Sequence, residues 1–192
     1  MNTALNGDGE PVPREAPPLR TTVSLSSPTC SLSGEEPFTV TTKHTNISDR
    51  PICALISLYT EFCHHVRLIN PTWGPNRRRR KIGPSSTWLG SDDDDDLLIM
   101  EIEDSTLVRL DAGEIFELPY TFTTVPGMRA EDTRTMTVGE SYEIELGTQK
   151  WWWEYEDEMP EVMSEVERKE HLLTRRPSEW TPDCVAHFTA RP

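Results

Sequence analysis

Hydrophobic and polar residues alternate most clearly between Ser105 and Phe122. After a turn expected at Gly113, hydrophobic side chains occupy every second position, at Phe116, Leu118, Tyr120 and Phe122. The positions between them are Glu117, Pro119 and Thr121. A period of two is typical of a strand with one buried face and one wet face. This segment therefore predicts a strand whose aromatic and leucine side chains point into a core.

Shorter segments with the same character recur along the chain. They predict strands over Thr21–Ser26, Phe38–Thr45, Ile52–Phe62, His64–Ile69, Leu97–Ile102, Ser141–Leu146, Lys150–Glu156 and Cys184–Thr189. Ile52–Phe62 is a nearly continuous apolar run, and its β-branched and aromatic residues favour a central strand over the rival helix. Many short strands separated by turn residues indicate a sandwich rather than a βαβ fold.

One helix is predicted, from about Pro160 to Leu173. Pro160 suits the first helical position, and Asp157, Glu158 and Glu161 lie near the positive N-terminal end of the helix. Hydrophobic residues fall near one stripe, at Met159, Val162, Met163, Val166 and Leu173. We therefore expect an acidic, amphipathic helix before the last strand.

Composition separates the expected domain from segments that we expect to be unpacked. Residues 1–20 are rich in proline, glycine and charge, and they predict a disordered tail because they cannot bury enough apolar area to offset chain entropy. Residues 21–192 are predicted to form a single domain. Residues 70–96 interrupt the strand pattern with a basic run, Arg77–Lys81, and an acidic run, Asp92–Asp96, and predict a long charged loop.

Charge limits the classes of partner. The net charge is −14, from 33 acidic and 19 basic residues, and such a field disfavours nucleic acid and anionic membrane surfaces as partners. The sequence has no apolar run of about 18 residues and no secretory pattern at its start, so we expect a cytoplasmic protein without a membrane span. The nucleus is an alternative location, because Arg77, Arg78, Arg79, Arg80 and Lys81 match a simple import patch. In either compartment the sequon at Asn46 is expected to be an unglycosylated turn.

Cysteine and histidine residues give no strong metal or catalytic pattern. The four cysteines, Cys30, Cys53, Cys63 and Cys184, have irregular spacing and are expected to be free thiols. His64 and His65 follow Cys63 directly, and His187 follows Cys184 by three positions, but on a strand such side chains diverge. The chain contains no nucleophile elbow, P-loop or dinucleotide motif, and Asp92–Asp96 lacks the ligand pattern of an EF-hand. We therefore expect no metal and no cofactor.

Three adjacent tryptophans are the most suggestive feature of the sequence. On a strand, Trp151, Trp153 and Tyr155 share one face and Trp152 takes the other. One arrangement leaves an exposed aromatic shelf that stacks on a ligand or a partner. In the other, which we favour, Trp151 and Trp153 fill the core and Trp152 lies under the acidic helix.

Several of these motifs are shared with a known group of proteins. The chain carries V-R-L-D-A-G-E-I-F-E-L-P-Y-T-F, then Y-E-I-E-L, then W-W-W-E-Y-E-D-E before a final C-V-A-H-F strand. In this respect it resembles a group of uncharacterised filamentous-fungal proteins with an L-x-x-G-x-x-F strand, a Y-x-(I/V)-x-L strand and a W-W pair before an acidic segment. The likeness covers about Thr21 to Thr189 and implies an immunoglobulin-like or arrestin-like sandwich in a fungal cytosol. It brings no functional residues, and the triple tryptophan and the charged loop depart from its pattern.

The fold that we expect is mostly β, an antiparallel immunoglobulin-like β-sandwich with one C-terminal acidic amphipathic helix before the last strand. Two functions fit it. The first is a non-catalytic intracellular interaction module of a fungus, which engages a protein partner through an acidic, tryptophan-rich surface. The second is a small accessory enzyme or ligand-binding protein of fungal secondary-metabolite biosynthesis, with a pocket between the sheets for a small hydrophobic ligand. The candidate surface comprises Trp151, Trp152, Trp153, Tyr155, His64, His65 and His187. The lack of a catalytic motif favours the first function.

Overall fold

The computed structural model describes residues 15–33, 36–57, 66–70, 79–81, 105–122, 124–125, 128–129, 136–160, 163–175 and 177–192. Its strands are β1 (Leu19–Leu25), β2 (Thr29–Ser31), β3 (Phe38–Asn46), β4 (Ile52–Ser57), β5 (Val66–Ile69), β6 (Arg79–Lys81), β7 (Ser105–Leu110), β8 (Ile115–Phe122), β9 (Thr124–Val125), β10 (Met128–Arg129), β11 (Ser141–Leu146), β12 (Gln149–Tyr155), β13 (Ser178–Trp180) and β14 (Val185–Arg191). The helices are a single 3-10 turn, η1 (Glu156–Glu158), and α3 (Glu165–Leu173).

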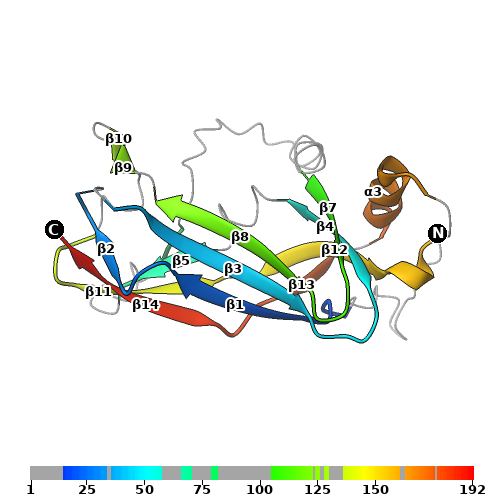
Figure 1. Ribbon diagram of the computed structural model, residues 1–192, viewed down its shortest axis with the longest axis horizontal. Coiled ribbons are helices and arrows are strands. Elements are labelled where there is room, and N and C mark those ends of the chain that lie inside the picture. The colour runs from blue at the N-terminus through cyan, green and yellow to red at the C-terminus, as the bar shows by residue number, and fades with distance from the viewer. Residues whose placement is uncertain are drawn as a thin grey trace, which may run out of the picture.

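The strands form a β-sandwich (Figure 1). One layer is the sheet β1-β3-β8, and behind it lie the sheets β2-β14-β11-β5-β6 and β13-β12-β4-β7, with β9 and β10 paired separately. Pairing between described strands is antiparallel except between β2 and β14. Only Gly147 and Thr148 separate β11 from β12, so these two strands carry the chain from one rear sheet into the other. The expected β-sandwich, with a helix before the last strand, is confirmed.

The alternation predicted for the segment after Gly113 is present in β8. Leu118 and Phe122 are buried, Phe116 and Tyr120 are half-buried, and the residues between them are exposed. Gly113 has a φ of 78°, a backbone conformation that glycine adopts without steric cost, and it forms the turn from β7 into β8. The hydrophobic period therefore identified the buried face correctly.

The turn between β3 and β4 is organised by Asn46, whose side chain is fully buried. Its Nδ2 donates to the carbonyls of Arg50, Leu110 and Asp111. Its Oδ1 accepts hydrogen bonds from the backbone N–H and the hydroxyl of Ser48, an Asx turn. The turn is confirmed, and the amide of the sequon is enclosed within the folded protein.

The helix is shorter than the sequence pattern predicted. It starts at Glu165 rather than Pro160, because Ser164 caps it and Ser164 and Glu167 form a reciprocal capping box. The predicted stripe is also partly wrong, since Val166 is 64% exposed whereas Leu172 is fully buried. The acidic residues before Met159 form η1 instead of a first helical turn.

Other element boundaries in the structure also differ from the predicted ones. The described chain starts at Glu15, and β1 begins at Leu19, so both lie inside the range expected to be an unpacked tail. In the expected loop at 70–96, Asn70 is fully buried and residues 79–81 form β6 on the edge of a sheet. The short strands β2 and β13 were missed. Residues 58–65, 71–78 and 82–104, with the strand predicted at Leu97–Ile102, lie outside the described residues.

Two apolar clusters fill the sandwich between its layers. The first lies between β1-β3-β8 and β2-β14-β11-β5-β6, and its buried members are Cys30, Phe38, Val40, Leu68, Leu118, Phe122, Met136, Tyr142, Ile144, Leu146, Phe188 and Ala190. The second lies toward the end that carries α3 and contains Ile52, Ala54, Ile56, Leu110, Trp151 and Trp153. A third cluster lies outside the sandwich, beneath α3.

Candidate functional site

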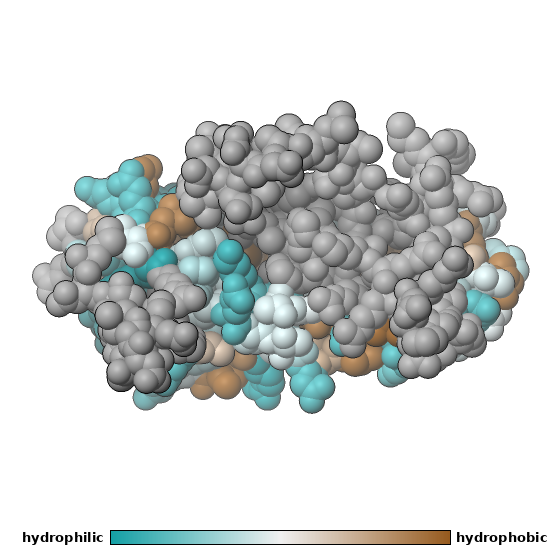
Figure 2. All heavy atoms as spheres, turned by 180° about the vertical axis from the view of Figure 1, so that it is seen from behind, coloured by the Kyte–Doolittle hydropathy of each residue, from teal (hydrophilic) through white to brown (hydrophobic). Residues whose placement is uncertain are grey.

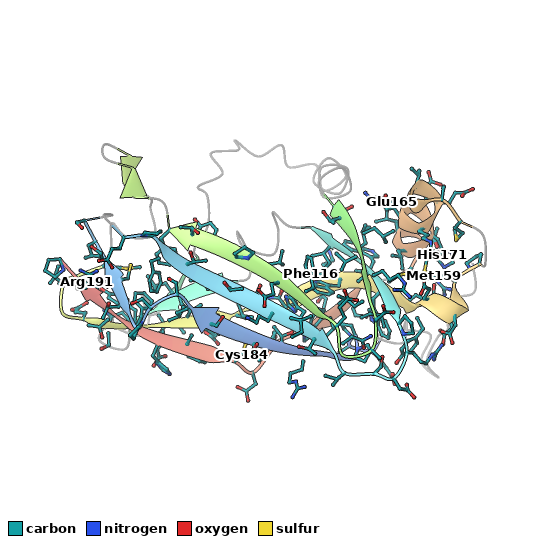
Figure 3. All side chains as sticks on the ribbon, viewed as in Figure 1. Phe116, Met159, Glu165, His171, Cys184 and Arg191 are labelled. Carbon is teal, nitrogen blue, oxygen red and sulfur yellow. The ribbon has the colours of Figure 1, made fainter. Side chains whose placement is uncertain are left out.

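The outer face of β12 is covered by α3. Trp152, which pairs in register with Leu55 of β4, is only 7% exposed. It packs with Cys53, Leu55, Met159 and Leu172 in the third cluster. Figure 3 shows Met159 and His171 between the helix and the sheet. The arrangement with Trp152 beneath the helix is confirmed, and the exposed aromatic shelf is wrong.

The inner face of β12 is equally enclosed. Trp151 is fully buried, and its ring centroid lies 4.6 Å from that of His44 and 5.5 Å from that of Trp180. Trp153 donates from Nε1 to the Ser178 hydroxyl over 2.9 Å and meets the half-buried Tyr155 edge-on. The three tryptophans therefore support the fold from within, and none of them offers a broad open ring face.

A buried carboxylate joins β12 to the helix. The side chain of Glu154 is only 6% exposed. His171 Nε2 lies 2.7 Å from Glu154 Oε2, and Arg175 donates to Glu154 Oε1 over 2.6 Å. A carboxylate in such a place is tolerated only when cationic or N–H donors compensate for its lost hydration. The contact therefore ties both the last turn of α3 and the residue two positions beyond it to the sheet.

A second carboxylate makes a parallel connection. Glu156 accepts from Arg109 Nε of β7 over 2.7 Å and from Arg168 of α3 over 3.3 Å. Arg109 also contacts Asp111 at 2.9 Å, and these acidic partners raise the pKa of Arg109 further above its usual range. We call Glu154, Glu156, Arg109, Arg168, His171 and Arg175 the α3 clamp. It binds one short helix to two strands by charge as well as by apolar contact.

The only described cysteine at this site is not activated. Cys53 lies beneath the clamp, with its Sγ 3.5 Å from the Arg168 guanidinium. Burial raises the pKa of the Cys53 thiol, and the nearby Glu156 carboxylate raises it further, against a smaller lowering by Arg168. The thiolate is the nucleophilic form, so this thiol is poorly suited to covalent catalysis. The geometry holds a helix in place and presents no activated nucleophile here.

The solvent-exposed residues of η1 and α3 are mostly acidic. They include Asp157 and Glu158 on η1 and Glu165, Glu167 and Glu170 on α3, and we call these five residues the acidic end. Residues 154–175 hold eight acidic and three basic side chains, a net charge of −5 with histidine neutral. Arg50 pairs with Asp157 and Glu158 and lowers the pKa of the Asp157 carboxyl. The hydrogen bonds from Ser164 lower the pKa of Glu167.

One aliphatic side chain lies among these carboxylates. Val166 is 64% exposed on α3. Among the residues that the structure describes, the other large exposed hydrophobic residues belong to other elements or turns, and they are Ile47, Ile115, Val138 and Val185. Figure 2 shows hydrophobic and hydrophilic residues alternating along the lower rim of the face it displays. Val166 is therefore distinguished by its charged surroundings rather than by the size of an apolar patch.

The remaining candidate residues are not gathered with the tryptophans. His187 is exposed on β14, in a different sheet, where its Nδ1 lies 3.5 Å from Glu143. His64 and His65 lie outside the described residues. The sequence reading missed Glu154, His171 and Arg175, although His171 and Arg175 are four positions apart, a spacing that places two side chains on one side of a helix. The structural role of this spacing becomes visible only in the structure, where both side chains contact Glu154.

Comparisons with known proteins add no identity: no protein-family model and no curated protein matches this sequence. In the part of the chain that the structure describes, no group of three or more histidine, cysteine or acidic residues is placed to hold a metal ion. Within the same residues, no helix has the length and apolar character needed to cross a bilayer. Function is therefore inferred from geometry and charge.

Proposed function

We propose that the protein is a non-catalytic intracellular interaction module that binds a basic protein segment at the acidic end. The observation that carries the proposal is α3, where Val166 is exposed between Glu165 and Glu167 in sequence and one turn before Glu170, with Glu165 paired to Lys169. Carboxylates around one aliphatic side chain favour a partner with lysine or arginine residues flanking an apolar residue. Complementary charge speeds encounter and selects the partner, and apolar contact adds affinity.

The α3 clamp supports this role because it fixes the helix before any partner arrives. A free helix of this length is marginal in water, so a partner would otherwise have to order it on binding. Here Leu172 is fully buried, and Glu154 and Glu156 bind the helix at two points. The tryptophans act indirectly in this proposal, since Trp152 forms the floor on which α3 rests. The partner meets the helix, not the indole rings.

The source of the protein and its cellular location are proposed from the sequence alone. The resemblance to filamentous-fungal proteins supports a fungal source and a cytosolic location, with the nucleus as the alternative through Arg77–Lys81. The second candidate function, a ligand-binding protein of fungal secondary metabolism, is favoured by one observation. Polar side chains, among them His44 and Gln149, are fully buried between the sheets beside Trp151.

Binding of a defined basic probe tests the first proposal. The probe is a fluorescein-labelled helical peptide of lysine and leucine, titrated with the full chain at two salt concentrations. Glu165→Lys combined with Glu170→Lys should weaken binding by about tenfold or more, which is about 1.4 kcal/mol. Val166→Ser should weaken it by a smaller factor that persists at high salt.

The matched control carries the same change in net charge elsewhere. Glu36 pairs with Arg191, Asp183 directly precedes Cys184, and both acids are exposed. Figure 3 shows Arg191 and Cys184 away from Glu165 of α3, so Glu36→Lys with Asp183→Lys should change the affinity less than twofold. Equal losses in both double variants would mean that the probe responds only to total charge. An unchanged affinity in the α3 variant would place binding on another surface. Either result would refute the acidic end as the binding site.

A further inference from the structure

A layer of polar side chains crosses the interior of the sandwich. Along the inner face of β3, Phe38 and Val40 are followed by Thr42 and His44, and all four are buried. Thr42 pairs with Leu118 of β8, which belongs to the first apolar cluster. His44 faces Trp151, which belongs to the second. The polar layer therefore lies at the junction of the two clusters.

Gln149 enters the same layer from the opposite sheet. It is fully buried and lies two positions before Trp151 on β12, so both side chains point into the sandwich. β3 and β12 both run toward the end that carries α3 (Figure 1). The His44 and Trp151 rings are in contact, and Thr42 and Gln149, each two residues back along its strand, are displaced from that contact in the same direction.

Two atoms of this layer lack a partner among the residues that the structure describes. Thr42 Oγ1 and Gln149 Oε1 are buried and make no hydrogen bond to any of those residues. The amide nitrogen of Gln149 is already used, since it donates to the Gly147 carbonyl over 3.2 Å. His44 accounts for a neighbouring hydroxyl, because its Nδ1 lies 3.0 Å from Thr21 Oγ1. A buried donor or acceptor left unsatisfied is costly, and native interiors satisfy nearly all such groups.

We propose that Thr42 and Gln149 hold a buried water molecule between the two sheets, beside His44. The pair consists of one carbonyl acceptor and one hydroxyl, which suits a small neutral molecule that both donates and accepts. Water is the smallest such molecule, and buried waters satisfy otherwise unpaired groups of this kind. The bound water links β3 to β12 at the boundary between the clusters. It fixes which residues of the two strands face each other, because a slipped strand would set these polar groups against apolar side chains.

A double-mutant cycle on the full chain tests the shared water. Thr42→Val removes the hydroxyl, and Gln149→Met removes both the carbonyl acceptor and the amide donor. Each substitution keeps the side-chain volume nearly unchanged. Each should lower the midpoint of thermal unfolding by about 2–4 °C. The double variant should lose less than the sum of the two, since both substitutions break contacts to the same molecule. Gln149→Met also removes the hydrogen bond to the Gly147 carbonyl. This loss occurs with or without Thr42→Val, so it cancels in the coupling energy of the cycle.

The control is Thr41→Val on the outer face of the same strand, which should shift the midpoint by less than about 1 °C. A rise in the midpoint for both inner variants would show that the two groups are buried dry, and strictly additive losses would show that they share no ligand. Either result overturns the proposal.

Nuclear magnetic resonance of the labelled full chain gives a direct readout. A long-lived water should give cross-peaks to Thr42 and to the Gln149 side-chain amide. Thr42→Val should abolish the cross-peak between the water and the Gln149 amide. Native mass spectrometry of the protein as purified tests whether an organic molecule occupies the site instead of water. A stoichiometric organic molecule that is lost in the double variant would overturn the water and favour the ligand-binding function. Binding of the basic peptide should be unchanged in these variants, so failure here and failure of the acidic end are distinguishable.

Discussion

The two faces of β12 bury tryptophans by different means. On the inner face, Trp151 and Trp153 are held between whole sheets, in the cluster that includes Ile52 and Ile56 of β4. On the outer face, Trp152 depends on α3 for its cover, together with the charged contacts of Glu154. Trp152 and Trp153 are both 7% exposed, but the cover of Trp153 requires the whole sandwich and the cover of Trp152 requires one docked helix. The exposed fraction of a side chain therefore does not show whether global unfolding or the detachment of one helix would expose it.

The largest effect is expected on the inner face. Trp151→Ala should reduce the free energy of unfolding by about 3–5 kcal/mol, the usual result of emptying a large aromatic site in a core. The loss should appear in global urea unfolding, with all probes changing together. A loss below about 1 kcal/mol would mean that the sheets close over the site and that the inner face is less rigid than its contacts indicate.

A smaller and more local effect is expected for the outer face. Trp152→Ala should cost about 1–3 kcal/mol, because α3 can detach without opening the sandwich. Hydrogen exchange should show lost protection in α3 while β11 and β14 keep theirs. If β11 and β14 lose protection as much as α3, the outer cover belongs to the global cooperative unit, and the contrast between the two faces does not hold.

The sequence was a good guide where structure follows from local periodicity. The alternation in β8 and β11 identified the buried faces, and so did the alternation of Phe38, Val40 and Thr42 in β3. The helix start was misjudged because Pro160 and the acidic residues near it are weaker signals than the capping box of Ser164 and Glu167. The three-residue strands β2 and β13 were missed because they are too short to show a period.

The candidate site was much less visible in the sequence. Glu154 reads as a polar residue on a strand, and only its approach to His171 and Arg175 reveals a buried carboxylate. The unpaired groups of Thr42 and Gln149 belong to strands far apart in the chain, so no local pattern connects them. Contacts between distant segments decide both features, and periodicity carries no information about them.

Breaking the clamp should have an intermediate effect. Glu154→Gln removes the charge that faces His171 and Arg175 but keeps the size of the side chain. We expect a loss of about 1–2 kcal/mol, within the range for hydrogen bonds to charged groups. The matched control is Glu143→Gln, whose partner His187 is largely exposed, and it should cost less than about 0.5 kcal/mol. Similar losses in both variants would remove the distinction between the buried and the exposed pair.

The smallest effect concerns the N-terminal cap of α3 and its contribution to stability at low pH. The pKa of Glu167 is lowered by its hydrogen bonds from Ser164. A carboxyl whose pKa is lower in the folded state stabilises that state above its unfolded pKa of about 4.3, and the contribution is lost as the pH falls through the folded value. Protection of α3 should therefore decline below about pH 4.

Ser164→Ala isolates this contribution. It should weaken α3 by about 1 kcal/mol at neutral pH, as the loss of a cap does. It should also flatten the decline in acid, because the pKa of Glu167 then returns toward its ordinary value in the folded state. Asp157 has a lowered pKa through Arg50 and retains it in the variant, so a residual decline is expected. An unchanged acid profile in Ser164→Ala would show that the cap is not what couples α3 to pH, and would leave Arg50 and Asp157 to account for it.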